Sequence, residues 1–266
     1  MTEPNLSLRE ILAFHVEAGV DVALADTPIN RFAAVTEETP APAVQALRPL
    51  PIIAPAPRAE AAPPAAPDAA VMEARVAAKR AQTLEELRDT LARFEGCALS
   101  ATATQLVFAD GTPGARAMFV GEAPGAEEDR EGLPFVGRSG KLLDRMIAAI
   151  GLKRSEVYIA NIVPWRPPGN RTPTPQESAI CLPFIRRQIE LANPDFLVVM
   201  GKPAMQTLLG INEGIRGVRG RWVDYDTGTR TIRALVMFHP AYLLRSPNEK
   251  RHSWRDFLAL KRALTA

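Results

Sequence analysis

Three polar residues of the kinds that do chemistry each follow an apolar run in this sequence. Glu122 lies in a Gly-Glu-Ala-Pro-Gly turn, Asn161 follows Val-Tyr-Ile-Ala, and His239 is one of only three histidines. A carboxylate can orient water, an amide offers a donor and an acceptor together, and a histidine titrates near neutral pH. An amide matches one edge of a pyrimidine base. Taken singly, the three also fit an ordinary loop, a turn cap and a structural histidine.

The apolar runs before these residues predict the elements that position them. Runs at 116–120, 157–160, 196–200 and 232–238 are typical of strands, and helical patterns are expected at 138–151, 175–192, 202–210 and 247–264. Buried strands that alternate with helices predict an α/β domain, a three-layer α/β/α sandwich around a mostly parallel four-stranded sheet. Sites in such sheets lie just past the carboxyl ends of the strands. The three polar residues are therefore expected at one edge.

The chain divides by composition into three parts. Residues 1–35 hold a short amphipathic helical segment, which begins at Ser7 with Glu10 three residues later. Residues 36–70 are expected to be a linker, since 21 of the 31 residues from 40 to 70 are Ala or Pro. The α/β domain is assigned to 71–266. A helical segment on a tether favours docking of a protein partner.

Composition bounds the class of protein. Of the 266 residues, 47% are hydrophobic and 23% are charged, as in soluble globular proteins. No apolar run is long enough to span a membrane. The net charge is only +2, but the last 66 residues hold twelve Lys/Arg against five Asp/Glu, an excess that suits phosphate contact as well as a solvated surface. Two cysteines fit a reducing cytoplasm. Nothing in the sequence requires more than a monomer.

Several motifs together resemble the bacterial family 4 uracil-DNA glycosylases. They are the Gly-Glu-Ala-Pro-Gly turn (121–125) with Glu127-Glu128-Asp129, Pro134-Phe135-Val136-Gly137, the segment Asn161–Arg171 with its Arg-Pro-Pro-Gly-Asn-Arg, and His239-Pro240-Ala241. The similarity runs from about Phe94 to the C-terminus. It implies the uracil-DNA glycosylase fold and hydrolysis of the bond between uracil and deoxyribose, with an abasic site as product.

The resemblance also implies roles for the site residues. Glu122 would be the catalytic or water-orienting acid, Glu128 a second acidic candidate, and His239 a hydrogen-bond donor to uracil O2. Phe135 would stack on the flipped base, while Asn161 would contact O4 and N3–H. Backbone N–H groups near Ala123 and Gly125 would help to bind the base. Candidate DNA contacts are the wedge residues Leu243, Leu244 and Arg245, and the phosphate-binding residues Ser139, Lys141, Lys202 and Arg251.

One departure concerns a cofactor. The family usually binds a [4Fe–4S] cluster through four cysteines, and the four positions here are Cys97, Ser100, Trp165 and Cys181. Because such a cluster normally needs four thiolates, the sequence predicts no iron–sulfur cluster and no other metal. The family's crosslinking members carry a basic insertion with a nucleophilic histidine after the first motif. Here Arg138-Ser139-Gly140 follows directly, which argues against a covalent mechanism.

Two other functions remain open. A DNA-binding module on the same fold would bind damaged DNA without releasing a base, although Glu122, Asn161 and His239 are all present. A hydrolase of free nucleosides would not need the basic C-terminal third or the Leu-Leu-Arg segment.

Overall fold

The structure is a computed structural model, and it describes residues 67–265. The expected N-terminal helical segment, and with it the expected partner-docking function, lies outside the described residues. Helix α2 (Pro67–Arg80) begins inside the range expected to be linker, a few residues before the predicted start of the domain at Val71.

A six-stranded sheet with the order β1-β3-β2-β4-β6-β5 forms the centre of the domain. Its four inner strands are parallel to one another: β2 (Ala117–Gly121), β3 (Tyr158–Asn161), β4 (Phe196–Met200) and β6 (Thr231–Met237). These four match the predicted strands to within one residue at either end. The predicted three-layer α/β class is confirmed.

The prediction of four strands was nevertheless wrong, because two antiparallel edge strands were missed. Strand β1 (Asp110–Gly111) pairs with β3, and β5 (Trp222–Asp226) pairs with β6. Strand β1 has only two residues, and β5 exposes Asp224 and Asp226 to solvent. Neither strand produces the continuous apolar run that marks a strand buried on both faces.

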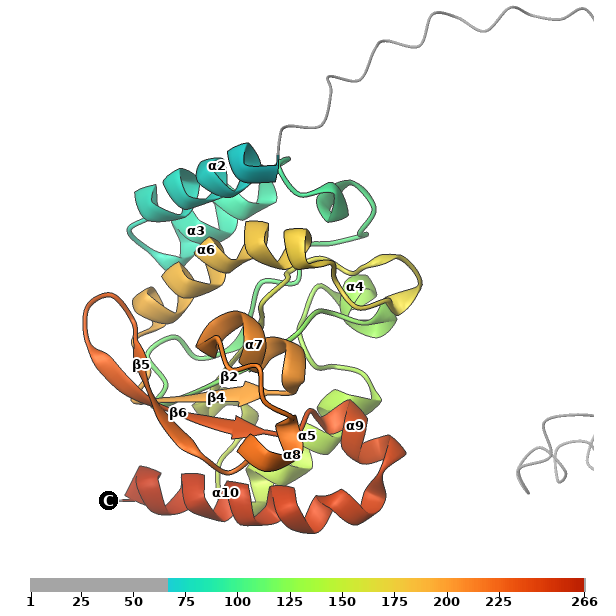
Figure 1. Ribbon diagram of the computed structural model, residues 1–266, viewed down its shortest axis with the longest axis vertical. Helices are drawn as coiled ribbons and strands as arrows, with labels where there is room; N and C mark the ends of the chain where they lie inside the picture. The colour runs from blue at the N-terminus through green and yellow to red at the C-terminus, as the bar shows by residue number, and fades with distance from the viewer. Residues whose placement is uncertain (1–66, 266) are drawn as a thin grey trace, which may run out of the picture. The chain divides into compact units, whose positions relative to one another are not determined.

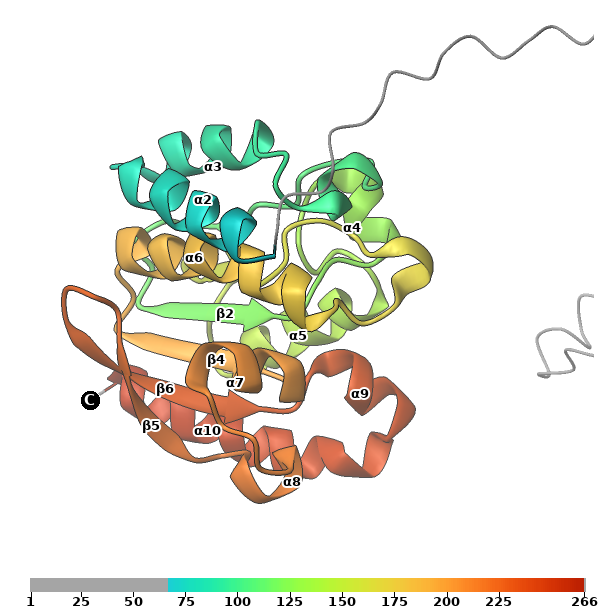
Figure 2. The same ribbon diagram turned by 45° about the horizontal axis from the view of Figure 1, so that its top comes forward.

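Helices cover both faces of the sheet, as Figures 1 and 2 show. One face packs against α6 (Pro175–Ala192) and α7 (Lys202–Leu209), with α2 and α3 (Leu84–Ala92) lying over α6. The other face packs against α5 (Arg138–Ala149) and α10 (Lys250–Thr265). Alternate residues of each strand enter the two apolar clusters: in β2, Met118 and Val120 lie on the α6 face and Phe119 on the α5 face.

Helix α6 shows how local signals set an element's bounds. The Thr174 hydroxyl accepts a hydrogen bond from the Glu177 backbone N–H at 3.2 Å, and the Glu177 carboxylate accepts one from the Thr174 N–H at 2.7 Å. This capping box, followed by a proline in the first turn, starts the helix where the sequence predicts it.

The remaining elements are short and lie mainly in the connections. They are η1 (Ala98–Ala101), α4 (Ala126–Glu131), η2 (Arg154–Glu156), η3 (Pro168–Asn170), α8 (Ile215–Val218), α9 (Pro240–Arg245) and η4 (Pro247–Glu249). Among the helices of residues 67–265, none has the length and apolar character needed to cross a membrane.

Candidate active site

The register of the sheet brings the predicted polar residues to one edge. Gly121 of β2 is paired with Asn161 of β3, so these two strands end level, and Glu122 follows at once. Across β4, Met200 is paired with Met237, and His239 lies two residues beyond the end of β6. In Figure 1 the arrowheads of β4 and β6 point toward α9, the helix that His239 precedes.

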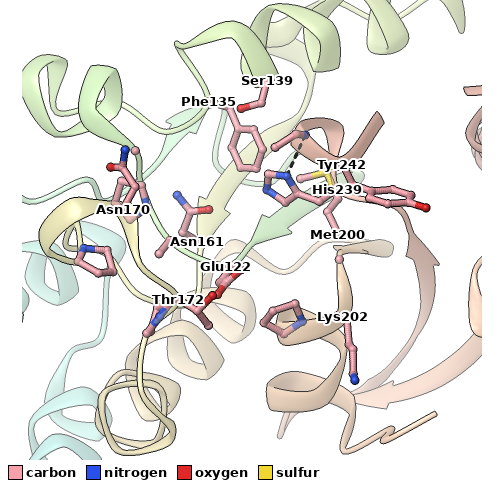
Figure 3. A pocket seen from close by; sticks show the side chains of 18 of the residues that line it. Glu122, Phe135, Ser139, Asn161, Asn170, Thr172, Met200, Lys202, His239 and Tyr242 are labelled. Carbon is pink, nitrogen blue, oxygen red and sulfur yellow. Dashed lines mark hydrogen bonds between the residues drawn. The ribbon is translucent and has the colours of Figure 1, made fainter. Parts of the chain in front are cut away.

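A cavity of about 680 Å³ opens at this edge (Figure 3). Among the residues that line it are ten of those singled out from the sequence: Glu122, Ala123, Gly125, Glu128, Phe135, Ser139, Asn161, Lys202, His239 and Arg245. Each strand end contributes to the lining, because the loops that follow β2, β3, β4 and β6 all turn around this opening. A ligand in the cavity therefore meets carboxylate, amide, imidazole and aromatic groups together.

Glu122 is half-buried in the wall of the cavity. Its Oε1 atom is buried and has no hydrogen-bond partner within the protein. Burial raises the pKa of Glu122, and the neighbouring Thr172 side chain opposes this rise only in part. An unpartnered buried carboxylate oxygen at the cavity wall is free to bind a water molecule or to face positive charge on a ligand.

Asn161 and Phe135 form the part of the cavity next to the end of β2. Asn161 is buried, and its Oδ1 atom also has no partner in the protein. Gly121 is required between them, since a Cβ atom there would lie 2.5 Å from Asn161 Oδ1 and 2.6 Å from the Phe135 ring. The Phe135 ring lies 5.4 Å from that of His239. The cavity therefore presents an amide edge beside an aromatic face.

His239 is held as a neutral donor. Its Nδ1 atom accepts a hydrogen bond from the Ala241 backbone N–H at 3.1 Å, the cap of helix α9 drawn in Figure 3. Burial, and then the nearby positive charge of Arg245, lower the pKa of His239 to about 4, with Glu128 opposing them. With Nδ1 used as an acceptor, the proton of the neutral ring is on Nε2. Nε2–H is therefore available as a donor at neutral pH.

Glu128 lines the cavity and bonds to the backbone through both carboxylate oxygens. One carboxylate oxygen accepts a hydrogen bond from the Gly125 N–H at 3.1 Å, and the other accepts one from the Gly137 N–H at 2.9 Å. Glu128 is thus the capping-box residue of α4, and it links Gly125 to Gly137 across the loop that contains this helix. Both oxygens of Glu128 are therefore engaged by the backbone of the 125–137 loop.

The candidate DNA contacts separate into three groups. Ser139, Leu244 and Arg245 line a hollow of about 420 Å³ that adjoins the cavity, and Lys202 lies in the cavity itself. Lys141 and Arg251 are exposed and line neither space. Leu243 is fully buried, so its assignment as a wedge was wrong. The turn of α9 directs Leu243 into the core and leaves Leu244 and Arg245 at the surface.

Sequence reasoning missed several residues of the cavity. Thr172 lies beside Glu122 and directly follows the Arg-Pro-Pro-Gly-Asn-Arg segment. Extending that segment by one residue would have included Thr172 among the candidate site residues. Tyr242 lies one turn into α9; its ring is 5.0 Å from that of Phe238, and its hydroxyl accepts a hydrogen bond from Arg216 at 2.9 Å. Met200 ends β4 at the same edge.

The two cysteines lie together in the apolar cluster on the α6 face. Interaction with the Cys181 side chain lowers the pKa of Cys97, and interaction with Cys97 together with burial raises the pKa of Cys181. The Ser100 hydroxyl donates to the Cys97 carbonyl at 2.9 Å, and Trp165 is buried in the same cluster. Within residues 67–265, no group of three or more His, Cys, Asp or Glu side chains is arranged to hold a metal ion.

The fold and the cavity define a class, the α/β proteins whose ligand site lies where parallel strands end. Residues 108–258 match the model of the uracil DNA glycosylase superfamily. The chain is 42% identical over 174 residues to the type-4 uracil-DNA glycosylase of Thermotoga maritima. The aligned region covers 65% of this chain and 89% of the relative. It is 38% identical over 184 residues to that of Sulfurisphaera tokodaii (67% and 84%) and 36% identical over 180 residues to that of Archaeoglobus fulgidus (66% and 90%). The chain belongs to the uracil DNA glycosylase superfamily.

Proposed function

We propose that this protein is a uracil-DNA glycosylase, which hydrolyses the N-glycosidic bond of uracil in DNA and leaves an abasic site. The observation that carries the proposal is the convergence of Glu122, Asn161 and His239 with the Phe135 ring on one cavity at the strand ends. The relatives reported above, each named a type-4 uracil-DNA glycosylase, support it.

The base must leave the duplex before its glycosidic bond is accessible. In the proposed complex the flipped uracil stacks on Phe135, and its N3–H donates to the Oδ1 atom of Asn161. This carbonyl oxygen has no partner within the protein, which supports a role in ligand binding. The Asn161 amide group donates to uracil O4. Cytosine presents an acceptor at N3 and an amino group at position 4, so it does not match this orientation of the amide.

Cleavage leaves a sugar with oxocarbenium character and a pyrimidine anion, and the protein must stabilise both. In the proposed mechanism the Nε2–H of His239 donates to O2 as negative charge accumulates there. A neutral donor suits this task because it keeps its proton across the physiological pH range, and the low pKa of His239 supports that assignment. The proton stays on the imidazole, and the uracil leaves as an anion held by hydrogen bonds.

Glu122 acts on the sugar side of the reaction. Its ionised carboxylate orients the attacking water and offsets positive charge on the sugar. The water adds to C1′ and passes a proton to the Glu122 carboxylate, and on product release this proton neutralises the uracil anion through solvent. The products are free uracil and an abasic site, with no covalent intermediate. The unpartnered Oε1 atom supports this role. Glu128 acts as a positioning residue, through its bonds to Gly125 and Gly137.

We propose that Leu244 and Arg245, which lie on the surface turn of α9, contact the DNA around the extruded nucleotide. Leu244 is the apolar wedge candidate that remains, beside Arg245, once Leu243 is assigned to the core. Ser139 and Lys202 are the phosphate contacts nearest the cavity. Lys141 and Arg251 would reach only phosphates farther along the strand.

We also propose that the protein functions without an iron–sulfur cluster. The donor set does not fit the group, because Ser100 and Trp165 supply no thiolate. Analysis of purified protein for iron and acid-labile sulfide tests this proposal; stoichiometric iron that survives chelation would contradict it.

The test of the function uses a labelled oligonucleotide with one uracil, single- and double-stranded, in the presence of a chelator. The proposal predicts free uracil and an alkali-labile abasic site. Binding of the oligonucleotide without release of uracil would favour the non-catalytic module. Equal activity on free deoxyuridine would favour a nucleoside hydrolase.

A further inference from the structure

The backbone at Phe135 adopts a conformation that needs support. Its φ of +55° lies in the left-handed region, which side chains larger than glycine rarely occupy. Phe135 is also buried, and its ring faces both the Asn161 amide and the His239 ring. Such a conformation persists only where the surrounding structure holds it.

Arg154 supplies that support from outside the cavity. It is the first residue of η2, and it is absent from the cavity lining. Its Nη2 atom donates to the Pro134 carbonyl at 2.6 Å, and its Nη1 atom donates to the Phe135 carbonyl at 3.1 Å. One guanidinium group thus holds two consecutive carbonyls at the turn that presents the ring.

Two carboxylates fix the guanidinium group in turn. The Nε atom of Arg154 donates to Asp110 of β1 at 2.6 Å, and Nη1 donates to Asp144 of α5 at 2.7 Å. The planar, forked geometry of arginine allows these contacts at once, which a lysine cannot reproduce. The Arg154 side chain is only 24% exposed, so the cluster is partly shielded from solvent.

Helix α5 closes the other side of the Phe135 carbonyl. A Cβ atom on Gly140 would lie 1.7 Å from that oxygen, so only glycine permits the approach. The carbonyl therefore lies between the first turn of α5 and the Arg154 guanidinium group, and the peptide after Phe135 has little freedom to rotate.

We propose that Arg154 is a positioning residue for base recognition, which acts by fixing the Phe135 ring in the orientation that stacks on the base. The inference rests on the proposed function. It adds that the ion-pair cluster of Asp110 (β1), Asp144 (α5) and Arg154 (η2) contributes to recognition of the base. Arg154 contacts neither the base nor the reacting atoms. Its whole effect passes through Phe135.

The test compares Arg154→Met and Arg154→Lys with Arg116→Met, in the wild-type background and in Phe135→Ala. Arg116 is a matched control, since it pairs with Asp195 at 2.8 Å and donates to the Leu264 carbonyl at the opposite edge of the sheet. Uracil release from single-stranded DNA and inhibition by free uracil are measured. NMR spectra of the protein with ¹³C-labelled phenylalanine, in which Phe135→Ala assigns the Phe135 ring, provide a readout independent of activity.

Arg154→Met is expected to lower kcat/KM by about 10- to 100-fold, as displacement of a binding group by up to about 1 Å does, and to weaken inhibition by uracil. In the Phe135→Ala background its further effect should be within about twofold. Arg154→Lys should recover part of the loss, and Arg116→Met should match the wild type. The Phe135 ring signals should shift in Arg154→Met, shift less in Arg154→Lys, and stay unchanged in Arg116→Met.

Unchanged ring signals and unchanged uracil inhibition in Arg154→Met would overturn the inference. An equal loss in the Phe135→Ala background would also overturn it, since the effect would not pass through the ring. Failure of the wild type to release uracil would instead refute the proposed function, and the ring signals would still decide whether Arg154 positions Phe135.

Discussion

The protonation of His239 leads to a quantitative prediction about stability. The folded state holds the pKa of His239 at about 4, whereas an unperturbed histidine has a value of about 6.5. Between these two values the unfolded chain binds a proton that the folded chain does not. Stability is therefore full above about pH 6.5 and falls as the pH is lowered toward 4.

The difference of about 2.5 between the two pKa values corresponds to at most about 3.4 kcal/mol, fully lost below pH 4. This is a substantial part of the roughly 5–15 kcal/mol that stabilises a typical domain. Carboxylates also contribute in this range: Glu177, for example, has a pKa of about 2 because it pairs with Arg171. Comparison with a variant that lacks the imidazole separates the two contributions.

His239→Asn is the appropriate variant. Asparagine cannot titrate, and its side-chain oxygen can still accept the Ala241 N–H, as it does at many helix N-termini. Urea unfolding between about pH 7.5 and pH 4 should show a steeper loss of stability in the wild type than in His239→Asn. His252→Asn, which changes a histidine beside Glu249 on another surface, serves as the control. The chain has three histidines, so each imidazole signal can be assigned by NMR.

Two results would refute the reasoning. One is an imidazole signal of His239 that titrates near its ordinary value in the folded protein. The other is a wild-type stability profile parallel to that of His239→Asn across the whole range.

Three further predictions concern the cavity and the DNA surface. Activity should rise with pH as Glu122 ionises, and this rise should lie above the ordinary carboxyl pKa because burial raises the pKa of Glu122. Glu122→Gln should be slower by about 100-fold or more and should lack this rise in the pH–rate profile; an unchanged profile would contradict the assignment. Gly121→Ala should leave the domain folded but weaken inhibition by free uracil at least several-fold, because the added methyl group would contact Asn161 and Phe135. Inhibition equal to that of the wild type would contradict the proposed binding of uracil between these two residues. Leu244→Ala should slow excision from duplex DNA more than from single strands, and equal losses on the two substrates would exclude a wedge role.

The sequence predicted best those elements whose signals are local. The capping box at Thr174 and the apolar run 196–200 set the start of α6 and the whole of β4, because backbone hydrogen bonds and burial on both faces leave direct traces in the sequence. The convergence of Glu122, Asn161 and His239 was predicted because sites in parallel sheets lie at the carboxyl ends of the strands. Glu122 directly follows β2, Asn161 ends β3, and His239 lies two residues beyond β6.

The sequence could not supply what depends on three-dimensional partners. Strand β5 has no continuous apolar run, because it is an edge strand with one face in water. The acidic run 127–129 does not say which carboxylate caps the helix, and the structure assigns that bond to Glu128. Helix α9 has only six residues, too few for periodicity to distinguish the buried Leu243 from the surface Leu244. Arg154 meets its carboxylate partners 44 and 10 residues away, a relation that one sequence does not contain.

The central claim is that Glu122, Asn161 and His239 act together to release uracil from DNA. The most direct measurement is the single-turnover rate of free uracil release from a single-stranded oligonucleotide, for the wild type and for Glu122→Gln, Asn161→Ala and His239→Asn. Arg88→Ala, on the exposed face of α3, is the control. The account predicts release by the wild type and the control, and rates lower by about 100-fold or more in each of the three variants. The account would be contradicted if the three variants released uracil as fast as the wild type. It would also be contradicted if the wild type bound the oligonucleotide but released no uracil.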